Sequence, residues 1–326
     1  MIDLEPRVGP LDYHQLVKEH KDRLAQFPRG WFPSWLVPNI DPRLGGDITF
    51  YNPSSPFKLS DEAGSPEYQF FRVEPIGCED SYAAPYKLEN GIYQPVHQLE
   101  RLRLEDPSVV RIQGKNILIG AEVWPDRTPE NPHGTNYCNV FYEIIGNFEE
   151  YKPIGRGPSR MKGIKLIDLG EDGIGVMSRP HIDEKKRGVL AFQVINNCDD
   201  LNPEKLLNGN IITNQVPDGN WVGVNEMYLL PNGKIGVLGH VAYEDRILGK
   251  QYAAMVFQYD WRTHLATPIK VIATADDFPE SESKTSAHNG VIYPCSLKFD
   301  FNAPFATLLA SLRDARYAGN RIFNPW

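Results

Sequence analysis

The chain has 326 residues, with 41% hydrophobic and 23% charged residues, and its formal net charge at pH 7 is −8. This acidic balance argues against a nucleic-acid binder, which would carry a basic face, and against attraction to anionic membranes. The 27 glycines, 27 prolines and 11% aromatic residues are typical of many short strands and tight turns rather than of a helical bundle.

The N-terminal sequence MIDLEPRVGPLDYHQLVKEH lacks a positive segment followed by an apolar core, so no secretion signal is predicted. No stretch approaches the length of a transmembrane helix. The four cysteines stand far apart without a CxxC pair, which indicates free thiols in a reducing compartment. We therefore expect a cytoplasmic protein.

Residues 1–40 differ from the rest of the chain and are predicted to form a strap. The apolar residues of the segment 11–26 predict one short helix. The following FPRGWFPSWLVP fits no regular element and is interpreted as a segment that packs across the body. Trp31 and Trp35 could alternatively stack on a sugar ring.

From residue 41 onward the sequence indicates a single domain built on a repeated hairpin. Three copies span residues 106–124, 163–182 and 224–243, each with a glycine in the turn. The turn glycines are Gly114, Gly173 and Gly233, about 60 residues apart. Weaker copies begin near residues 47 and 289, which gives five units. Because five blades close a ring without exposed edges, we predict an all-β, five-bladed β-propeller over residues 41–326, with the last residues completing a blade with N-terminal material.

Charged and titratable residues recur at matched positions in these hairpins. Asp106, Lys165 and Glu226 begin the first strands, and Glu122, Arg179, His181 and His240 follow or end the second strands. Antiparallel pairing brings both ends to one rim, so these residues are expected to surround one mouth of the propeller. Register adds further polar residues to the same ring: Asp47, Tyr51, Asn52, Asn225, Lys284, His288 and Asp314.

The sequence has no HExxH, Walker, dinucleotide, CxxC or GxSxG motif, so no cofactor and no metal is predicted. The remaining chemistry is that of carboxylates, assisted by histidine, arginine and tyrosine. Paired carboxylates at one mouth are what cleavage of a glycosidic bond requires.

The segments YNPSSPF, LEDPSVVRI and GVNEMYLLPNGKIGVLGHVAY resemble the five-bladed propeller superfamily of glycosidases and mannoside phosphorylases. Within it, the chain is most similar to a little-characterised branch of glycosidase-like propellers. The resemblance implies that Asp106, in EDPS, is the catalytic acid, and that Asp47 and Glu226 match a base or nucleophile and an acid. Ser108 stands where the family often has an arginine that binds sugar or phosphate, which argues against phosphorolysis.

We therefore expect a glycoside hydrolase that acts on a short oligosaccharide or glycoside. Its catalytic carboxylates would be Asp106, Glu226 and Asp47. The other ring residues would bind substrate: Tyr51, Asn52, Glu122, Lys165, Arg179, His181, Asn225, His240, His288 and Asp314. The alternatives are a phosphorylase that uses inorganic phosphate and a non-catalytic propeller that binds a sugar or a protein. A calcium ion held by carboxylates at the mouth is a weaker option.

Overall fold

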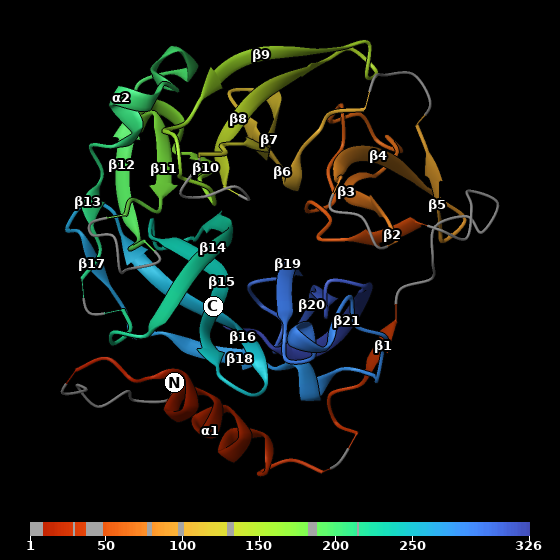
Figure 1. Ribbon diagram of the computed structural model, residues 1–326, viewed down its shortest axis with the longest axis vertical. Coiled ribbons are helices and arrows are strands. Elements are labelled where there is room, and N and C mark those ends of the chain that lie inside the picture. Colours follow the sequence, from red (N-terminus) through yellow and green to blue (C-terminus); the bar gives the residue numbers. More distant parts are fainter. Residues whose placement is uncertain are drawn as a thin grey trace.

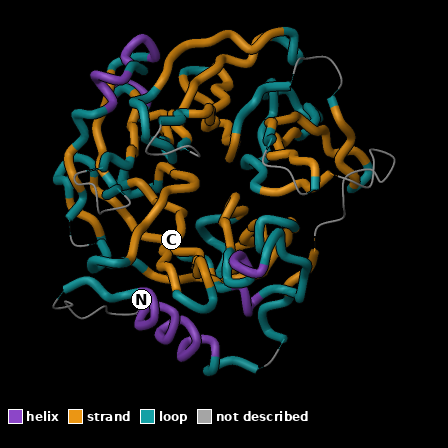
Figure 2. Tube along the Cα trace, in the orientation of Figure 1, coloured by secondary structure: helices purple, strands orange, loops and turns teal. Residues whose placement is uncertain are grey.

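The computed structural model describes residues 9–28, 30–36, 48–76, 80–96, 101–128, 134–181, 188–213 and 215–326. Within these residues the strands form five antiparallel sheets around a common axis (Figure 1). Strands dominate the trace, and the longest helix lies at one edge of the molecule (Figure 2). The predicted all-β, five-bladed propeller with an N-terminal helical strap is confirmed.

Each blade runs outward from the axis, so the first strand of each of the following sets is the innermost one. Blade 1 holds β2 (Ile48–Tyr51), β3 (Tyr68–Pro75), β4 (Tyr82–Glu89) and β5 (Ile92–Pro95). Blade 2 holds β6 (Glu105–Ile112), β7 (Lys115–Pro125), β8 (Thr135–Ile145) and β9 (Glu150–Arg156). Blade 3 holds β10 (Lys165–Asp168), β11 (Ile174–Ser178), β12 (Ala191–Ile195) and β13 (Asn210–Ile211).

Blade 4 holds β14 (Asn220–Leu229), β15 (Ile235–Asp245), β16 (Gly249–Asp260) and β17 (Leu265–Ala266), and β18 (Lys270–Ala273) also pairs with β16. Blade 5 holds β19 (Ile292–Lys298), β20 (Phe305–Leu312), β21 (Arg316–Phe323) and β1 (Ser34–Leu36). The described residues include two α-helices, α1 (Tyr13–Leu24) and the short α2 (Pro203–Leu206). They also include short 3₁₀ helices: η2 (Gly170–Asp172), η3 (Cys198–Asp200), η4 (Ala275–Asp277) and η5 (Ser286–His288).

The ring closes through the N-terminus. The strand β1 is the outermost strand of blade 5, where it pairs antiparallel with β21 from Ser34 opposite Asn320 to Leu36 opposite Ala318. This confirms that N-terminal material completes the blade that the C-terminal strand leaves open. The pairing covers an edge that would otherwise expose unpaired backbone groups.

The three predicted hairpins are the two inner strands of blades 2, 3 and 4. Their turn glycines, Gly114, Gly173 and Gly233, all have positive φ, at 83°, 102° and 76°. Only glycine adopts such angles without steric cost, which is why this residue type marks the turns in the sequence.

The apolar strand faces pack between blades. One core cluster joins blades 2 and 3, with Ile117 and Phe141 of one against Val176 of the other, and similar clusters lie at the other blade interfaces. The sheets therefore form one continuous ring of cores, and the inner strands are held rigidly around the axis.

The strap packs on blades 4 and 5. Asp12 caps α1 in a capping box with Gln15, and the helix buries Tyr13, Leu16 and His20. No helix in the described part of the chain is long and apolar enough to span a membrane. Cys138, Cys198 and Cys295 are free thiols, and Cys78 lies outside the described residues.

Three inner strands carry a β-bulge at corresponding places. The register shifts in β6 between Glu105 and Ser108, in β14 between Val224 and Glu226, and in β19 between Pro294 and Ser296. A bulge places two residues opposite one and re-aims the side chains that follow it. These bulges determine which polar residues of the inner strands face the mouth.

The close approach of β14 and β15 gives a stability prediction. A Cβ at Gly239 would overlap the backbone carbonyl oxygen of Gly223, which cannot rotate away. We expect Gly239→Ala to lower the free energy of unfolding by roughly 3 kcal/mol, as in other overpacked cores. In Gly290→Ala the atoms nearest to the added Cβ are those at the side-chain end of Gln251, which can rotate, so the stability of this variant should change little. Equal denaturation midpoints for both variants would contradict this interpretation.

Candidate functional site

A central pocket of about 670 Å³ opens at one mouth of the propeller. Among the described residues, its lining includes six lysines and arginines and three carboxylates. The cations are Arg72, Lys162, Lys165, Arg179, Lys250 and Lys284; the carboxylates are Glu105, Asp106 and Asp314; His181, His240 and His288 also line it. The pocket is therefore cationic within a chain of net charge −8, and is suited to an anionic ligand.

Asp106 lies on the bulge of β6 with a left-handed backbone, at φ 49°. Its carboxylate accepts a hydrogen bond from Asn52 Nδ2 at 2.8 Å and from Arg72 Nη1 at 3.4 Å. Burial opposes ionisation of this carboxyl, but the charges of Arg72 and Lys162 and the Asn52 hydrogen bond outweigh it and lower the pKa of Asp106 to about 2. Strained backbone at a polar pocket is typical of functional sites.

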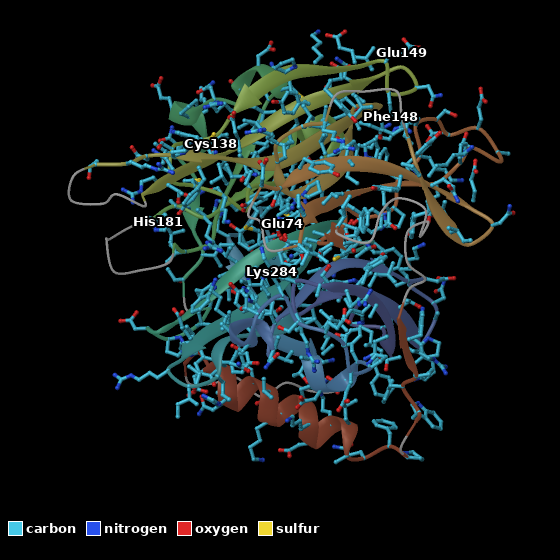
Figure 3. The ribbon with its side chains drawn as sticks, turned by 45° about the vertical axis from the view of Figure 1, so that its right-hand side comes forward. Glu74, Cys138, Phe148, Glu149, His181 and Lys284 are labelled. Carbon is cyan, nitrogen blue, oxygen red and sulfur yellow. The ribbon has the colours of Figure 1, made fainter. Side chains whose placement is uncertain are left out.

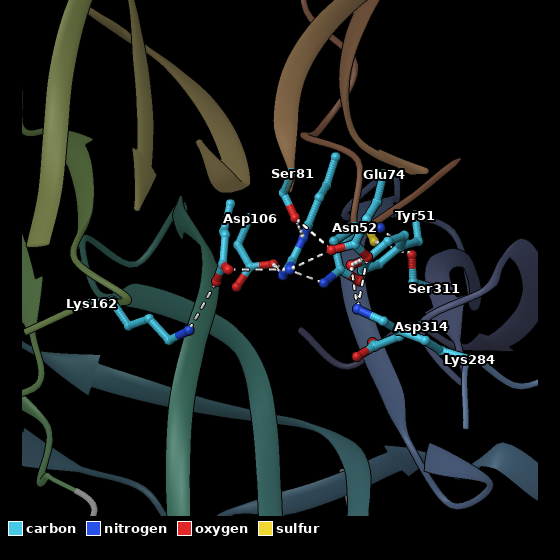
Figure 4. A network of polar contacts seen from close by, with 12 residues as sticks. Tyr51, Asn52, Glu74, Ser81, Asp106, Lys162, Lys284, Ser311 and Asp314 are labelled. Atoms are coloured by element: carbon cyan, nitrogen blue, oxygen red, sulfur yellow. Dashed lines mark hydrogen bonds and ion pairs between the residues drawn. The ribbon is translucent and has the colours of Figure 1, made fainter. Parts of the chain in front are cut away.

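Arg72, from β3, joins the carboxylates of blades 1 and 2. Figure 4 shows this polar network, in which Asn52, Glu74 and Asp106 are labelled. The Arg72 guanidinium lies 3.2 Å from Glu105 and 3.6 Å from Glu74, and Nε donates to Ser81 at 2.8 Å. Its Cζ lies over the ring of Tyr51, 4.9 Å from the ring centroid. Arg72 is 8% exposed, so its charge is compensated almost entirely by these neighbours.

Glu74 ties this network to blade 5. It accepts hydrogen bonds from Tyr51 Oη at 2.5 Å and from Lys284 Nζ at 2.7 Å. Glu74 and Lys284 lie side by side at the centre of the molecule, and His181 lies farther from that centre (Figure 3). Burial favours the neutral carboxyl of Glu74, but these donors and Arg72 lower its pKa. The cation of Lys284 is thereby fixed at the wall of the pocket.

Asp314 contributes a carboxyl group whose pKa is shifted in the opposite direction to that of Asp106. It lies in the turn between β20 and β21, also at positive φ, with His288 Nε2 3.7 Å away. Burial and the nearby charge of Asp106 raise the pKa of Asp314. One pocket thus holds two carboxyl groups whose pKa values are shifted in opposite directions, a common arrangement in acid–base sites.

Lys165 begins β10 at the floor of the pocket, and its ammonium group donates to Ser108 Oγ at 2.8 Å. Below it lies an inner cavity of about 50 Å³, whose lining includes Lys165, Ser108 and Glu226. Burial lowers the pKa of Lys165 to about 8 and raises that of Glu226 to about 7. Glu226 accepts hydrogen bonds there from Ser55 and Tyr228.

His240, on β15, lines the pocket on the side of blade 4. Its Nδ1 is hydrogen-bonded to Asn225 Oδ1 at 2.8 Å, and its ring stacks on Tyr252 with centroids 4.9 Å apart. Burial, with the charge of Arg179, lowers the pKa of His240 to about 3, so the ring is neutral at physiological pH. It therefore offers a hydrogen bond rather than a charge.

The structure brings most of the predicted ring together, but not all of it. The predicted residues that line the central pocket are Asn52, Asp106, Lys165, Arg179, His181, His240, Lys284, His288 and Asp314. Tyr51 and Asn225 lie behind the pocket wall and hold Glu74 and His240 in place. Asp47 lies outside the described residues.

Two predicted positions differ from the expectation. Glu122 does not line the pocket: Ala121 does, and because successive side chains of a strand point to opposite faces, Glu122 turns outward and pairs with Arg156. Glu226 lies below the floor rather than at the mouth, because the bulge at Asn225 shifts it by one position.

Sequence reasoning missed Arg72, Glu74, Glu105 and Lys162. A signal for the first two was present in FFRVEP, where an arginine and a glutamate alternate with apolar residues in a strand that is otherwise buried. Buried charges of this kind are paired and mark a polar network. Among the described residues, no group of three or more His, Cys, Asp or Glu side chains is placed to hold a metal ion.

Several solved structures share this architecture. A mannose phosphorylase from Leishmania mexicana, in complex with phosphate ion, has 25% identity and a TM-score of 0.79, over 96% of this chain and 94% of that one. A GDP-Man-dependent mannosyltransferase from the same organism has 23% identity and a TM-score of 0.81, over 97% and 96%. A β-1,2-mannobiose phosphorylase from Listeria innocua has 11% identity and a TM-score of 0.60, over 90% and 97%.

No curated protein sequence matches the chain. A family model described as "Protein of unknown function (DUF1861)" matches residues 44–325, which include every strand of the five blades except β1. The chain belongs to the DUF1861 family, within the five-bladed propeller superfamily of glycosidases and mannoside phosphorylases.

Proposed function

We propose that this protein is a carbohydrate-active enzyme that cleaves a glycoside with inorganic phosphate, as a glycoside phosphorylase. The observation that carries the proposal is the excess of lysine and arginine over carboxylates among the described residues that line the central pocket around Asp106. A neutral sugar and water need no such excess, whereas a phosphate dianion does. The similarity to a mannose phosphorylase in complex with phosphate ion supports the same reading.

The pKa of Asp106 links phosphate to the chemistry. Arg72, Lys162 and Lys165 hold this carboxyl ionised, and an ionised carboxyl cannot protonate a leaving group. A dianion bound among the same cations offsets their charge and raises the pKa of Asp106. The carboxyl then becomes a general acid only when phosphate is bound.

The reaction balances with these groups alone. Hydrogen phosphate attacks the anomeric carbon, the glycosidic C–O bond breaks, and Asp106 gives its proton to the leaving oxygen. The sugar phosphate leaves with one proton fewer than hydrogen phosphate brought, and that proton restores Asp106. Asn52 Nδ2 orients the carboxylate, and Asn52 Oδ1, buried with no hydrogen-bond partner among the described residues, is available to a sugar hydroxyl.

Ser108 no longer argues against phosphorolysis. It stands where an arginine was expected, but its hydroxyl accepts a hydrogen bond from Lys165, so a cation from blade 3 lies at that place. Lys165 also lines the pocket and is available to a phosphate oxygen.

This role gives a pH prediction. Lys165 is charged below its pKa of about 8 and neutral above it, so phosphate affinity should decline as the pH rises from about 7 to about 9. Isothermal titration of phosphate across this range should show the decline in the wild type, and Lys165→Gln should bind weakly and lack the pH dependence. An alkaline decline that persists in Lys165→Gln would assign it to another group.

A hydrolase remains the second candidate, because Asp106 and Asp314 are two carboxyl groups with opposite pKa shifts in one pocket. Initial rates on mannosides, glucosides, galactosides and furanosides, with and without phosphate, distinguish the two. A phosphorylase turns over only with phosphate. The rate of a hydrolase does not depend on phosphate. A binding module binds sugar but shows no turnover.

A further inference from the structure

Lys165 joins the central pocket to the inner cavity below its floor. It lines both spaces, and its ammonium group carries three N–H donors. One of these donors is used on Ser108 Oγ, at 2.8 Å. The others are available to a ligand in the central pocket and to a group in the inner cavity. Lys165 can therefore transmit a change of charge in the inner cavity to a ligand in the central pocket.

Glu226 contributes a carboxyl group to the lining of the inner cavity. It accepts hydrogen bonds from Ser55 and Tyr228, and within the described part of the chain it makes no direct ion pair with Lys165. The two groups still act on one another. Burial raises the pKa of Glu226 and lowers that of Lys165, and the charge of each group opposes the shift of the other. The protonation of each therefore depends on that of its neighbour.

The hydrogen bonds around Glu226 fit both of its protonation states. Ser55 Oγ contacts two acceptors, the carboxylate of Glu226 and the carbonyl oxygen of Cys295 at 3.2 Å, but its hydroxyl has a single proton. When Glu226 is ionised, Ser55 donates to it. When Glu226 is protonated, its O–H can donate to Ser55, which turns its own proton to the carbonyl oxygen of Cys295. Glu226 can therefore gain or lose a proton without leaving a group of this set unpaired.

The inner cavity has the room and the polar partners for a bound water. Its volume of about 50 Å³ exceeds the space that one water needs. Asn225 lines the cavity and is 5% exposed. Its Oδ1 is hydrogen-bonded to His240, whereas its Nδ2 has no hydrogen-bond partner among the described residues. A water that accepts from this amide and from Lys165 can donate to Glu226.

We propose that Glu226, through a water bound in the inner cavity, sets the charge of Lys165 and is thereby a positioning residue for phosphate in the central pocket. The role in phosphate binding rests on the proposed function, whereas the link between Glu226 and Lys165 does not. Glu226 does not line the central pocket, so it acts through Lys165 rather than on the ligand. Once ionised, it keeps Lys165 charged and able to bind a phosphate oxygen.

The other titratable groups around this pair keep one charge state between about pH 6 and about pH 9. Asp106, with a pKa of about 2, stays ionised, and His240, with a pKa of about 3, stays neutral. Burial raises the pKa of Cys295 to about 12 and those of Tyr228 and Tyr293 well above their usual value, so all three stay neutral. A change in the titration of Lys165 over this interval therefore reports on Glu226.

The test follows Lys165 by carbon NMR of the full chain, isotope-labelled at the Cε atom of lysine, with the signal assigned from Lys165→Gln. In the wild type we expect two steps, one near about pH 7 as Glu226 ionises and one near about pH 8 as Lys165 loses its proton. In Glu226→Gln the first step should disappear and the second should fall by about one pH unit, the effect of removing a nearby opposite charge. Below about pH 6 the two proteins should coincide, because glutamine resembles the protonated side chain. A purely structural change would move the signal at every pH.

Glu89→Gln is the matched control. Glu89 pairs with Lys87 at 2.7 Å and lines neither the inner cavity nor the central pocket, so Lys165 should titrate in this variant as in the wild type. If Glu226→Gln does not fold, Lys165→Gln gives the reciprocal measurement. In protein labelled at the Cδ atom of glutamate, the signal that titrates near about pH 7 in the wild type should then titrate about one pH unit higher.

Titration of inorganic phosphate separates this link from the proposed function. The midpoint of the alkaline decline in affinity should lie about one pH unit lower in Glu226→Gln than in the wild type. A wild type that does not bind phosphate would contradict the proposed function and the positioning role, while the titration of Lys165 still tests the link. The link is overturned if Lys165 titrates alike in the wild type and in folded Glu226→Gln, or if a high-resolution crystal structure shows no water within hydrogen-bond distance of Asn225 Nδ2 and Lys165 Nζ.

Discussion

Asp106→Asn should reduce turnover by about 10³-fold, within the range for loss of a general acid. The amide has nearly the same shape but no acidic proton to give to the leaving oxygen. It can still accept a hydrogen bond from Asn52, so the fold and the binding of phosphate should survive. Steady-state rates at saturating glycoside and phosphate measure the effect, and titration of phosphate tests that binding is retained.

Asp61→Asn is the control for this variant. Asp61 is an exposed carboxylate that pairs with Arg111 at 2.8 Å and does not line the central pocket. Its rate should be that of the wild type. Turnover by a folded Asp106→Asn protein at more than about a tenth of the wild-type rate is outside the range for a lost general acid and would remove Asp106 from the reaction.

Arg72→Met should lower the free energy of unfolding by about 3–5 kcal/mol, the usual cost of removing one partner of a buried charge network. Methionine fills part of the volume but leaves Glu74, Glu105 and Asp106 without their shared cation. Arg111→Met removes an exposed pair instead and should cost no more than about 1 kcal/mol. Urea denaturation of both variants at pH 7 gives the comparison.

The pH dependence of this loss identifies its origin. The folded-state pKa of Asp106, about 2, lies below its unfolded value of about 3.9. The stability that Asp106 contributes is therefore present above about pH 4 and lost as the pH falls toward 2. The difference between wild type and Arg72→Met should shrink over the same interval. A difference that is constant with pH would mean that lost packing, rather than lost charge, destabilises the variant.

The repeat in the sequence predicted the blades because it rests on local chemistry. Gly114, Gly173 and Gly233 mark hairpin turns that need positive φ, and their spacing sets the size of a blade. Counting residues back from these turns predicted that Asp106 and Lys165 lie at one mouth of the propeller, and both line the central pocket. Strand length and alternation are properties of neighbours in the chain, so they can be read without a structure.

The other parts of the site depend on features that cannot be predicted by counting residues from the turn glycines. The bulge at Asn225 moves Glu226 below the floor, although its distance from the turn glycine matches that of Asp106 and Lys165 to within one residue. A one-residue insertion in a strand reverses which face a side chain takes. Arg72 was not predicted because blade 1 does not share the turn pattern, and because two of its carboxylate partners, Glu105 and Asp106, come from blade 2. Their contacts are made only when the ring closes.

The most direct measurement of the central claim is phosphorus NMR of the protein incubated with mannosides, glucosides, galactosides and furanosides in the presence of inorganic phosphate. We expect that, with at least one glycoside, a sugar phosphate signal grows as the phosphate signal falls, in equal amounts, and that Asp106→Asn shows neither change. Free sugar released at the same rate with or without phosphate, and no phosphorus signal of an ester, would contradict it and assign the pocket to hydrolysis.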